Sequence, residues 1–325
     1  MSSSRGADEV RIKVKVLSQR DSLSVPARFV PIPGRLRTLE VGISVKTTER
    51  NFVDVLKCYG ARHGIAVELL AHDWIAVMSR GAQRHLAFGY DLGLNSASAA
   101  KIANDKGATY QVLTAAGLAA VEHRVFLHPR FLDFLPVDGN WPNLLAAFEA
   151  FNRDAVIKDN EGTGGMEVFR VRSQTELEQR AHQLMQIARS VALAPFLAIE
   201  AEQRFVMLEG DCVLAYAKER ADGEWRHNLG LGARAQRLDP ASAELAPALI
   251  LARAAMAALT LRFASIDVVT VAGAPMVLEA NAGVMLEAAS RPELGGRELT
   301  ERIYGRALDL IFADGSPLGP RSGRG

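Results

Sequence analysis

Cysteine is scarce in this sequence of 325 residues, which contains only Cys58 and Cys212. The two cysteines lie far apart, and neither belongs to a paired Cys motif. This spacing argues against a disulfide scaffold and against a cysteine-ligated zinc site. We therefore expect a protein of the reducing cytoplasm.

The sequence also lacks an excess of charge of one sign and a long apolar run. Thirty-eight Lys and Arg residues balance thirty-seven Asp and Glu residues, for a formal net charge of +1. The N-terminus has no apolar signal core, and the most apolar stretches are interrupted by Glu244, Arg253 and Arg262 before they reach membrane-spanning length. We expect neither nucleic acid nor a membrane as a partner, so an anionic ligand must be met by local groups.

Strand-like and helical patterns alternate along the remaining sequence, which predicts an α/β (α+β) fold. Residues 39–45 and 65–70 are predicted strands on either side of an amphipathic helix at 51–64, an order that favours a parallel sheet. The predicted organisation is an N-terminal extension (1–38), an N-terminal α/β domain (39–95), a larger domain (96–312) and a disordered tail (313–325).

Near the C-terminus, the position of the turn in a predicted hairpin determines which residues face each other across its two strands. If its turn centres on Gly273, Asp267 faces Glu279 across the two strands, and Asn281 shares their face. Two carboxylates placed opposite each other repel unless a cation neutralises them. Hard oxygen donors of this kind suit magnesium, although a capping Asp and a solvent-exposed Glu would be the more common arrangement for isolated acids.

A glycine-rich loop follows the predicted strand at 155–159. Lys158 stands near the end of this strand, and Gly162, Thr163, Gly164 and Gly165 follow it. Such a loop allows backbone N–H groups to approach phosphate oxygens, and the lysine can supply charge. The spacing is neither a Walker motif nor a dinucleotide fingerprint, and read alone it is more typical of a hairpin turn.

Four segments in this order, NDKGAT, VIKDNEGTGG, EAEQRF and VLEANAG, resemble the ATP-grasp superfamily and its branch of RimK-like carboxylate–amine ligases. The resemblance covers about residues 90–312. It implies an ATP-grasp fold with an N-terminal Rossmann-like α/β domain, a small central α+β lid at about 120–198, and a C-terminal α+β domain. The chain departs from the family in the hinge at 195–197 and in the loop after Asn281.

The resemblance also implies roles for individual residues. It implies ATP-binding lysines at Lys106 and Lys158, a phosphate-covering loop at Gly162, Thr163, Gly164 and Gly165, a hinge at Pro195, Phe196 and Leu197 that contacts adenine through its backbone, Glu202 near the ribose, Arg204, Arg226 and Asn228 at the reacting groups, and magnesium ligands at Asp267, Glu279 and Asn281.

The resemblance implies an ATP- and magnesium-dependent ligase. It would join the carboxylate of an amino acid to an amine through an acyl phosphate. Two magnesium ions are expected, with Mn²⁺ as a substitute, and a homodimer is expected by resemblance only. The alternatives are an ATP-grasp kinase of a small molecule and a noncatalytic nucleotide-binding module.

Overall fold

The structure, a computed structural model, describes residues 50–134 and 140–313. Apart from Arg50, these residues belong to one compact unit that begins at Asn51. The predicted N-terminal extension, the predicted strand at 39–45 and nearly all of the predicted tail lie outside the described residues. None of the described helices is both long and apolar enough to span a bilayer.

A three-stranded sheet follows the first described helix, α1 (Asn51–His63). Its strands are β1 (Ala66–Leu70), β2 (Ile75–Arg80) and β3 (Gln83–Phe88), and each pairs antiparallel with the next. The parallel pair predicted from the sequence joins residues 39–45 to β1, and residues 39–45 lie outside the described residues. Only residues 71–74 join β1 to β2, which is too short for the crossover that a parallel pair requires.

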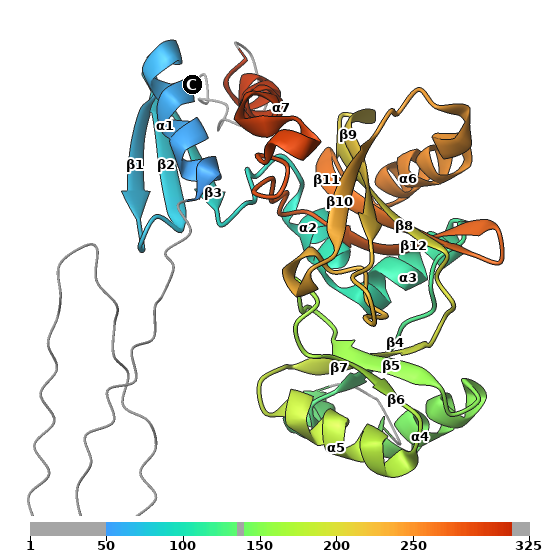
Figure 1. Ribbon diagram of the computed structural model, residues 1–325. Helices are drawn as coiled ribbons and strands as arrows, with labels where there is room; N and C mark the ends of the chain where they lie inside the picture. Colours follow the sequence, from blue (N-terminus) through green and yellow to red (C-terminus); the bar gives the residue numbers. More distant parts are fainter. Residues whose placement is uncertain (1–49, 135–139, 314–325) are drawn as a thin grey trace, which may run out of the picture. The chain divides into compact units, whose positions relative to one another are not determined.

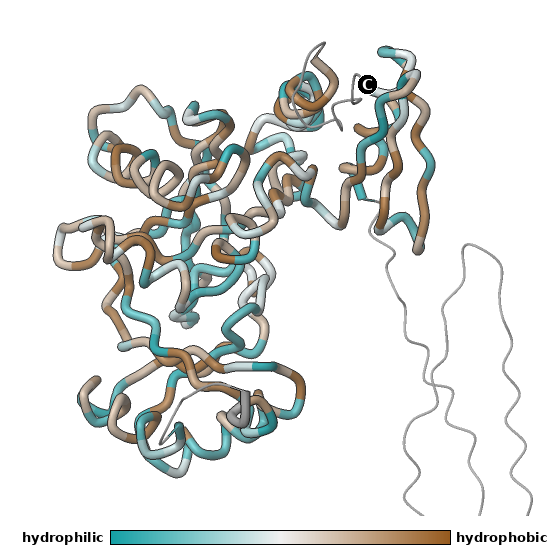
Figure 2. The backbone as a smooth tube through the Cα atoms, turned by 180° about the vertical axis from the view of Figure 1, so that it is seen from behind, coloured by the Kyte–Doolittle hydropathy of each residue, from teal (hydrophilic) through white to brown (hydrophobic). Residues whose placement is uncertain are grey.

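A four-stranded sheet, which we call the central sheet, occupies the predicted lid region and has the order β4-β7-β5-β6. Its elements are β4 (Arg124–Leu127), α4 (Asn140–Ala150), β5 (Ala155–Asp159), β6 (Val168–Val171), α5 (Gln174–Met185) and β7 (Ser190–Pro195). Helices α4 and α5 cover one face of the sheet (Figure 1) and share a buried core with it. The strands are mostly brown in Figure 2, whereas the two helices alternate between brown and teal, as amphipathic helices should.

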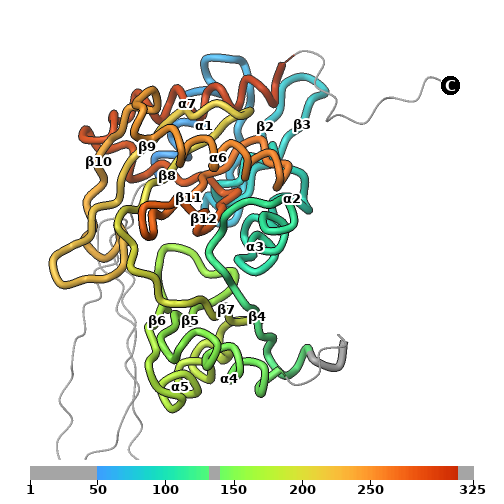
Figure 3. The backbone as a smooth tube through the Cα atoms, turned by 90° about the vertical axis from the view of Figure 1, so that its right-hand side faces the viewer, coloured from blue at the N-terminus to red at the C-terminus, as the bar shows by residue number. Residues whose placement is uncertain are grey.

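A five-stranded sheet, which we call the large sheet, has the order β10-β9-β8-β11-β12. Its strands are β8 (Ala201–Leu208), β9 (Asp211–Glu219), β10 (Arg234–Leu238), β11 (Phe263–Val271) and β12 (Ala274–Asn281). Helices α2 (Ala97–Asn104), α3 (Lys106–Ala115) and α6 (Ala246–Ala258) share a buried core with it, and α7 (Gly296–Phe312) follows β12 along the chain (Figure 3).

Side-chain caps fix the starts of the helices that lead into these sheets. The Ser96 side chain accepts a hydrogen bond from the N–H of Ala99 at 3.1 Å, and the Asp105 side chain accepts one from the N–H of Ala108 at 2.8 Å. Ser173 caps α5 in the same way, with the N–H of Glu176 donating to its hydroxyl at 3.2 Å. Because Asp105 ends one helix and caps the next, Lys106 occupies the first position of α3.

The β11–β12 hairpin pairs Asp267 with Glu279, as the sequence predicts, although its turn differs from the predicted one. The turn is tighter than predicted, because Val271 pairs with Ala274 across only two residues. This shift alone would move Glu279 out of register with Asp267. A β-bulge at Asp267/Val268 adds one residue to β12 and restores the pair.

Glu287 links the segment after β12 to the start of α1. Its carboxylate accepts hydrogen bonds from the N–H groups of Asn51 at 3.0 Å and Phe52 at 3.4 Å, and from the Tyr90 hydroxyl at 3.0 Å. A negative charge at a helix N-terminus is favourable because unpaired N–H groups gather there. One side chain distant in sequence thus caps α1.

We expect Glu287→Ala to lower the free energy of unfolding by about 1–2 kcal/mol, because α1 loses its cap. Chemical denaturation of both proteins measures the difference. Glu293→Ala, which removes an exposed glutamate in the same segment, is the matched control and should change stability by less than about 0.5 kcal/mol. Equal stability of Glu287→Ala and the parent protein would contradict the capping role.

Candidate active site

Two lysines from different segments lie at the junction of the central sheet and helix α3. Lys106 and Lys158 are 7% and 9% exposed. The Lys106 ammonium group donates to the backbone carbonyls of Gly162 at 2.6 Å and Asn160 at 3.2 Å. Burial, together with the neighbouring charge of Lys106, lowers the pKa of Lys158 to about 8. An anion bound here would therefore be favourable, because it would offset the repulsion between two buried cations.

The glycine loop after β5 adopts backbone conformations that favour glycine, and a side chain from another segment contacts it. Gly164 and Gly165 have φ values of +72° and +64°. Asn228, from the segment between β9 and β10, donates a side-chain hydrogen bond to the Gly164 carbonyl. Thr163 is exposed in the same loop. The structure thus brings the loop together with Lys106 and Asn228, as the sequence predicts.

One face of the large sheet carries a network of buried charges opposite the face that packs on α6. Arg204 donates to both Asp267 oxygens at 2.6 Å, and Lys218 donates to Asp267 at 2.8 Å and to Glu202 at 2.5 Å. Glu279 lies next to this group, 3.8 Å from Arg204. Three carboxylates thus face two cations, which leaves one formal negative charge.

Electrostatics in this network keep Asp267 ionised. Burial by itself would raise the pKa of Asp267, but Arg204 and Lys218 hold it well below its usual range. The Asp267 carboxylate is fully buried, so its pairing with both cations is a condition of stability. The charges of Glu279 and Glu202 also favour the charged form of Lys158, so the lysine of the central sheet is an electrostatic neighbour of the acids of the large sheet.

The proposed magnesium ligands retain free oxygen capacity. Asp267 Oδ1 accepts one hydrogen bond, from Arg204, and Asn281 donates its Nδ2 to Glu279 Oε1 at 3.3 Å, which leaves its amide oxygen as an acceptor. Among the described residues no cluster of three or more His, Cys, Asp and Glu side chains forms a metal site. The donors here are instead two carboxylates and an amide, a set of hard oxygens that fits magnesium.

Arg226 lies in the same loop as Asn228 but is paired with a neighbour. Its guanidinium donates to Glu224 at 2.8 and 3.0 Å, and this pairing lowers the pKa of Glu224 to about 2. It also reaches the carbonyl of Val168 at 3.4 Å. The segment therefore contacts both the glycine loop and β6 of the central sheet. A role for Arg226 at the reacting group stays a prediction.

At the hinge between the two sheets, apolar side chains form a small cluster. It consists of Val121, Ala194, Leu197, Ile199, Val269, Val271, Met276 and Leu278. The Phe196 N–H donates to the Asp154 carbonyl at 2.9 Å, and Pro195 has no N–H. Neither can therefore donate to a base in this arrangement, so a backbone N–H contact to adenine falls to Leu197 within the predicted hinge.

Comparison with known proteins agrees with this geometry. Residues 141–296 match the family model described as RimK-like ATP-grasp domain. This part of the chain is therefore similar to a RimK-like ATP-grasp domain. The matched range includes the glycine loop and all three predicted magnesium ligands, whereas Lys106 lies before it. This match confirms the resemblance predicted from the sequence.

Solved structures support the ATP-grasp fold. D-alanine–D-alanine ligase from Bacillus anthracis aligns with a TM-score of 0.51 and 14% identity, over 67% of this chain and 68% of that one. The same enzyme complexed with ATP aligns with a TM-score of 0.50 and 16% identity, over 67% of each chain. At such identities the likeness establishes the fold alone. No curated protein matches the sequence.

Within the matched range, sequence reasoning missed Lys218, which bridges Glu202 and Asp267. A lysine inside an otherwise apolar predicted strand was the available signal. The two-residue turn of the β8–β9 hairpin, taken alone, would place Ala217 opposite Glu202, and a register shift at Val206/Met207 brings Lys218 there instead.

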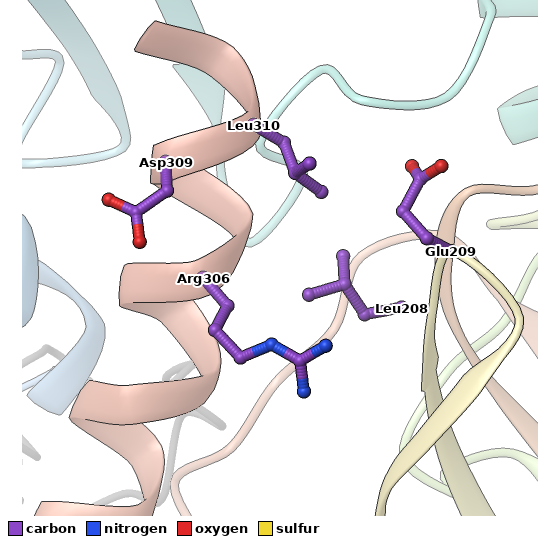
Figure 4. Close-up of a pocket in the computed structure, with 5 residues that line it drawn as sticks. All are labelled: Leu208, Glu209, Arg306, Asp309 and Leu310. Atoms are coloured by element: carbon purple, nitrogen blue, oxygen red, sulfur yellow. The ribbon is translucent and has the colours of Figure 1, made fainter. Parts of the chain in front are cut away.

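A surface pocket lies at the other end of β8, away from the charged network. It is lined by Leu208, Glu209, Arg306, Asp309 and Leu310 (Figure 4). None of the predicted site residues lines it, so it is not the candidate active site.

We expect Lys218→Met to destabilise the protein by about 3–5 kcal/mol, because it leaves buried Glu202 short of its partner and Asp267 with one cation. Chemical denaturation measures this loss. The double variant Lys218→Met/Glu202→Gln removes both charges of one pair and should recover part of the stability. A double variant that is less stable than Lys218→Met would contradict the pairing.

We expect Gly165→Ala to destabilise the protein more than Gly164→Ala. Both positions have positive φ and so carry a similar backbone penalty of about 1 kcal/mol. A Cβ at Gly165 would in addition overlap the Asn228 side chain, whereas a Cβ at Gly164 meets nothing within 4 Å. Equal melting temperatures of the two variants would show that Asn228 does not pack against the loop.

Proposed function

We propose that the protein is an ATP- and magnesium-dependent ligase that acts on small molecules. It would join the carboxylate of an amino acid to an amine and release ADP and phosphate. The observation that carries this proposal is the meeting of two buried lysines and a glycine loop with the carboxylates of the large sheet. An ATP-grasp domain with this arrangement could place a nucleoside triphosphate between the lysines of the central sheet and α3 and the carboxylates of the β11–β12 hairpin.

The chemical problem is that a carboxylate is anionic and has a poor leaving group. Transfer of the ATP γ-phosphoryl group to a carboxylate oxygen breaks the bond between the β,γ-bridging oxygen and the γ-phosphorus, and forms an acyl phosphate plus ADP. The amine then attacks the carbonyl carbon, phosphate leaves, and the amine loses a proton. Placement and charge neutralisation are the main tasks of the protein.

This chain's residues would divide these tasks. Lys106, Lys158 and the N–H groups of the glycine loop would hold the phosphates. Arg204, which pairs with Asp267 and lies 3.8 Å from Glu279, would stabilise charge on the transferring group. Asn228, already bonded to Gly164, would keep the loop closed over the nucleotide, and Glu202 would lie near the ribose.

Asp267, Glu279 and Asn281 are the residues that would hold magnesium. When bound, the metal would neutralise the phosphate oxygens and act as a Lewis acid on the transferring phosphoryl group. We infer two ions from the family resemblance, with Mn²⁺ able to replace Mg²⁺. A homodimer and a cytoplasmic location are further expectations of the same kind.

Incubation of the purified protein with ATP, Mg²⁺, hydroxylamine and a panel of amino acids tests the proposal. We expect ADP release that depends on one acid, together with formation of its hydroxamate. A stable phosphorylated product in place of the hydroxamate would indicate a kinase. Nucleotide binding without turnover across a broad panel would indicate a noncatalytic module.

We expect Lys158→Ala and Glu279→Ala to lower turnover by about 100-fold or more, because each removes a charge that acts on the transferring group. Both variants should keep the parent circular dichroism spectrum. Glu293→Ala, an exposed glutamate outside the site, should retain parent activity. Parent-level turnover in either site variant would refute the site assignment.

A further inference from the structure

A buried histidine with one unused ring nitrogen lies on the site-facing side of the central sheet. His123 is 3% exposed. Its Nδ1 lies 2.9 Å from the carbonyl of Val121, whereas its Nε2 is buried and has no hydrogen-bond partner. A buried polar atom without a partner is rare in folded proteins and calls for a ligand or a solvent molecule.

The side of the sheet that His123 faces follows from its neighbours. Glu122 and Arg124 form an ion pair at 2.7 Å, and the Arg124 guanidinium lies 4.9 Å from the centre of the Phe151 ring, on the helix-covered face. Side chains alternate along an extended segment, so His123 points to the opposite face. Lys158 belongs to that opposite face, because its strand neighbour Ile157 lies in the helix-covered core.

Strand register separates the two ends of this face. Arg124 pairs with Leu193, so His123 is level with Ala194, and Ala194 pairs with Val156 of β5. Lys158 is level with Ala192, and Asn160 is further along, next to Ser190. The phosphate-binding groups therefore lie toward one end.

His123 lies at the other end, beside the hinge. Ala194 belongs to the apolar hinge cluster, together with Val121. The flat aromatic face of a base fits this end, because the cluster presents apolar side chains and no charged one. His123 Nε2 thus lies where the edge of a base would approach.

The protonation state of His123 fixes what its Nε2 can bind. A carbonyl can only accept, so Nδ1 carries the proton that it donates to Val121. Burial, Lys158 and Lys106 together hold the pKa of His123 well below its ordinary value, so the ring is neutral. Its Nε2 is then an acceptor that requires a donor from the ligand.

We propose that His123 selects adenine by accepting a hydrogen bond from the 6-amino group of the base. Hypoxanthine and guanine carry a 6-oxo group instead, which would place an acceptor against the Nε2 lone pair. The inference rests on the proposed use of ATP, and it adds a residue that decides which nucleotide is used.

The test is calorimetric titration of the full-length protein with MgATP and with MgITP, which carries the 6-oxo group. The parent protein should prefer ATP. His123→Gln retains a carbonyl acceptor near the Nε2 position and should keep the preference, whereas His123→Asn, whose amide falls near the Nδ1 position, should lose it. We expect the ATP/ITP affinity ratio to fall about tenfold in His123→Asn, the scale of an unmade buried hydrogen bond.

His227→Leu is the matched control, because His227 is also buried, with Nδ1 on a carbonyl and no partner for Nε2. It should leave the ATP/ITP ratio unchanged even if both affinities fall. Equal weakening of ATP and ITP binding in His123→Asn, or equal affinities in the parent, would overturn the selection of adenine while leaving ATP use intact. A parent protein that binds neither nucleotide would overturn the proposed function itself.

Discussion

The buried charge network on the large sheet is the constraint on which the site depends. Asp267 is fully buried and stays ionised only because Arg204 and Lys218 both donate to it. Removal of one member leaves an uncompensated charge in a medium of low polarity. The sheet must therefore bring residues of four strands into register, and the predicted magnesium site follows from that register.

The same network explains how the proposed magnesium site and cationic side chains could coexist. Three carboxylates meet two cations, so the group keeps a formal negative charge that an added cation can offset. Lys158 approaches from the central sheet and is itself stabilised in its charged form by Glu279 and Glu202. The two sheets are thus electrostatically complementary at the place where a polyphosphate would lie.

The segment between β9 and β10 couples the two sheets mechanically. Asn228 bonds the glycine loop, Arg226 reaches the Val168 carbonyl, and the Trp225 ring meets the Phe196 ring edge-on with centroids 5.6 Å apart. Arg170 in turn lies 3.3 Å from the centre of the Phe196 ring. Side-chain contacts therefore connect the glycine loop to the hinge, and a nucleotide bound here would be enclosed by contacts from both sheets.

The sequence by itself determined most elements and the types of site residue. Sequence patterns located α1, β1, β5 and the β11–β12 hairpin, and charged residues at the ends of apolar strands marked Lys158, Asp267 and Glu279. Strand partners were less accessible, because a strand pattern does not state which strand lies beside it. The described strands of the N-terminal sheet, for example, are antiparallel, a pairing that the sequence did not predict.

Only the tertiary structure decided the exact pairings, since a single bulge moves every later residue to a new partner. In the β11–β12 hairpin the turn is one residue shorter than predicted, and a bulge offsets this difference, so Asp267 and Glu279 pair as predicted. In the β8–β9 hairpin a register shift likewise brought Lys218 to Glu202, a pair that the two-residue turn alone would not give. Residue types thus follow from the sequence, whereas their contacts follow from bulges that packing alone selects.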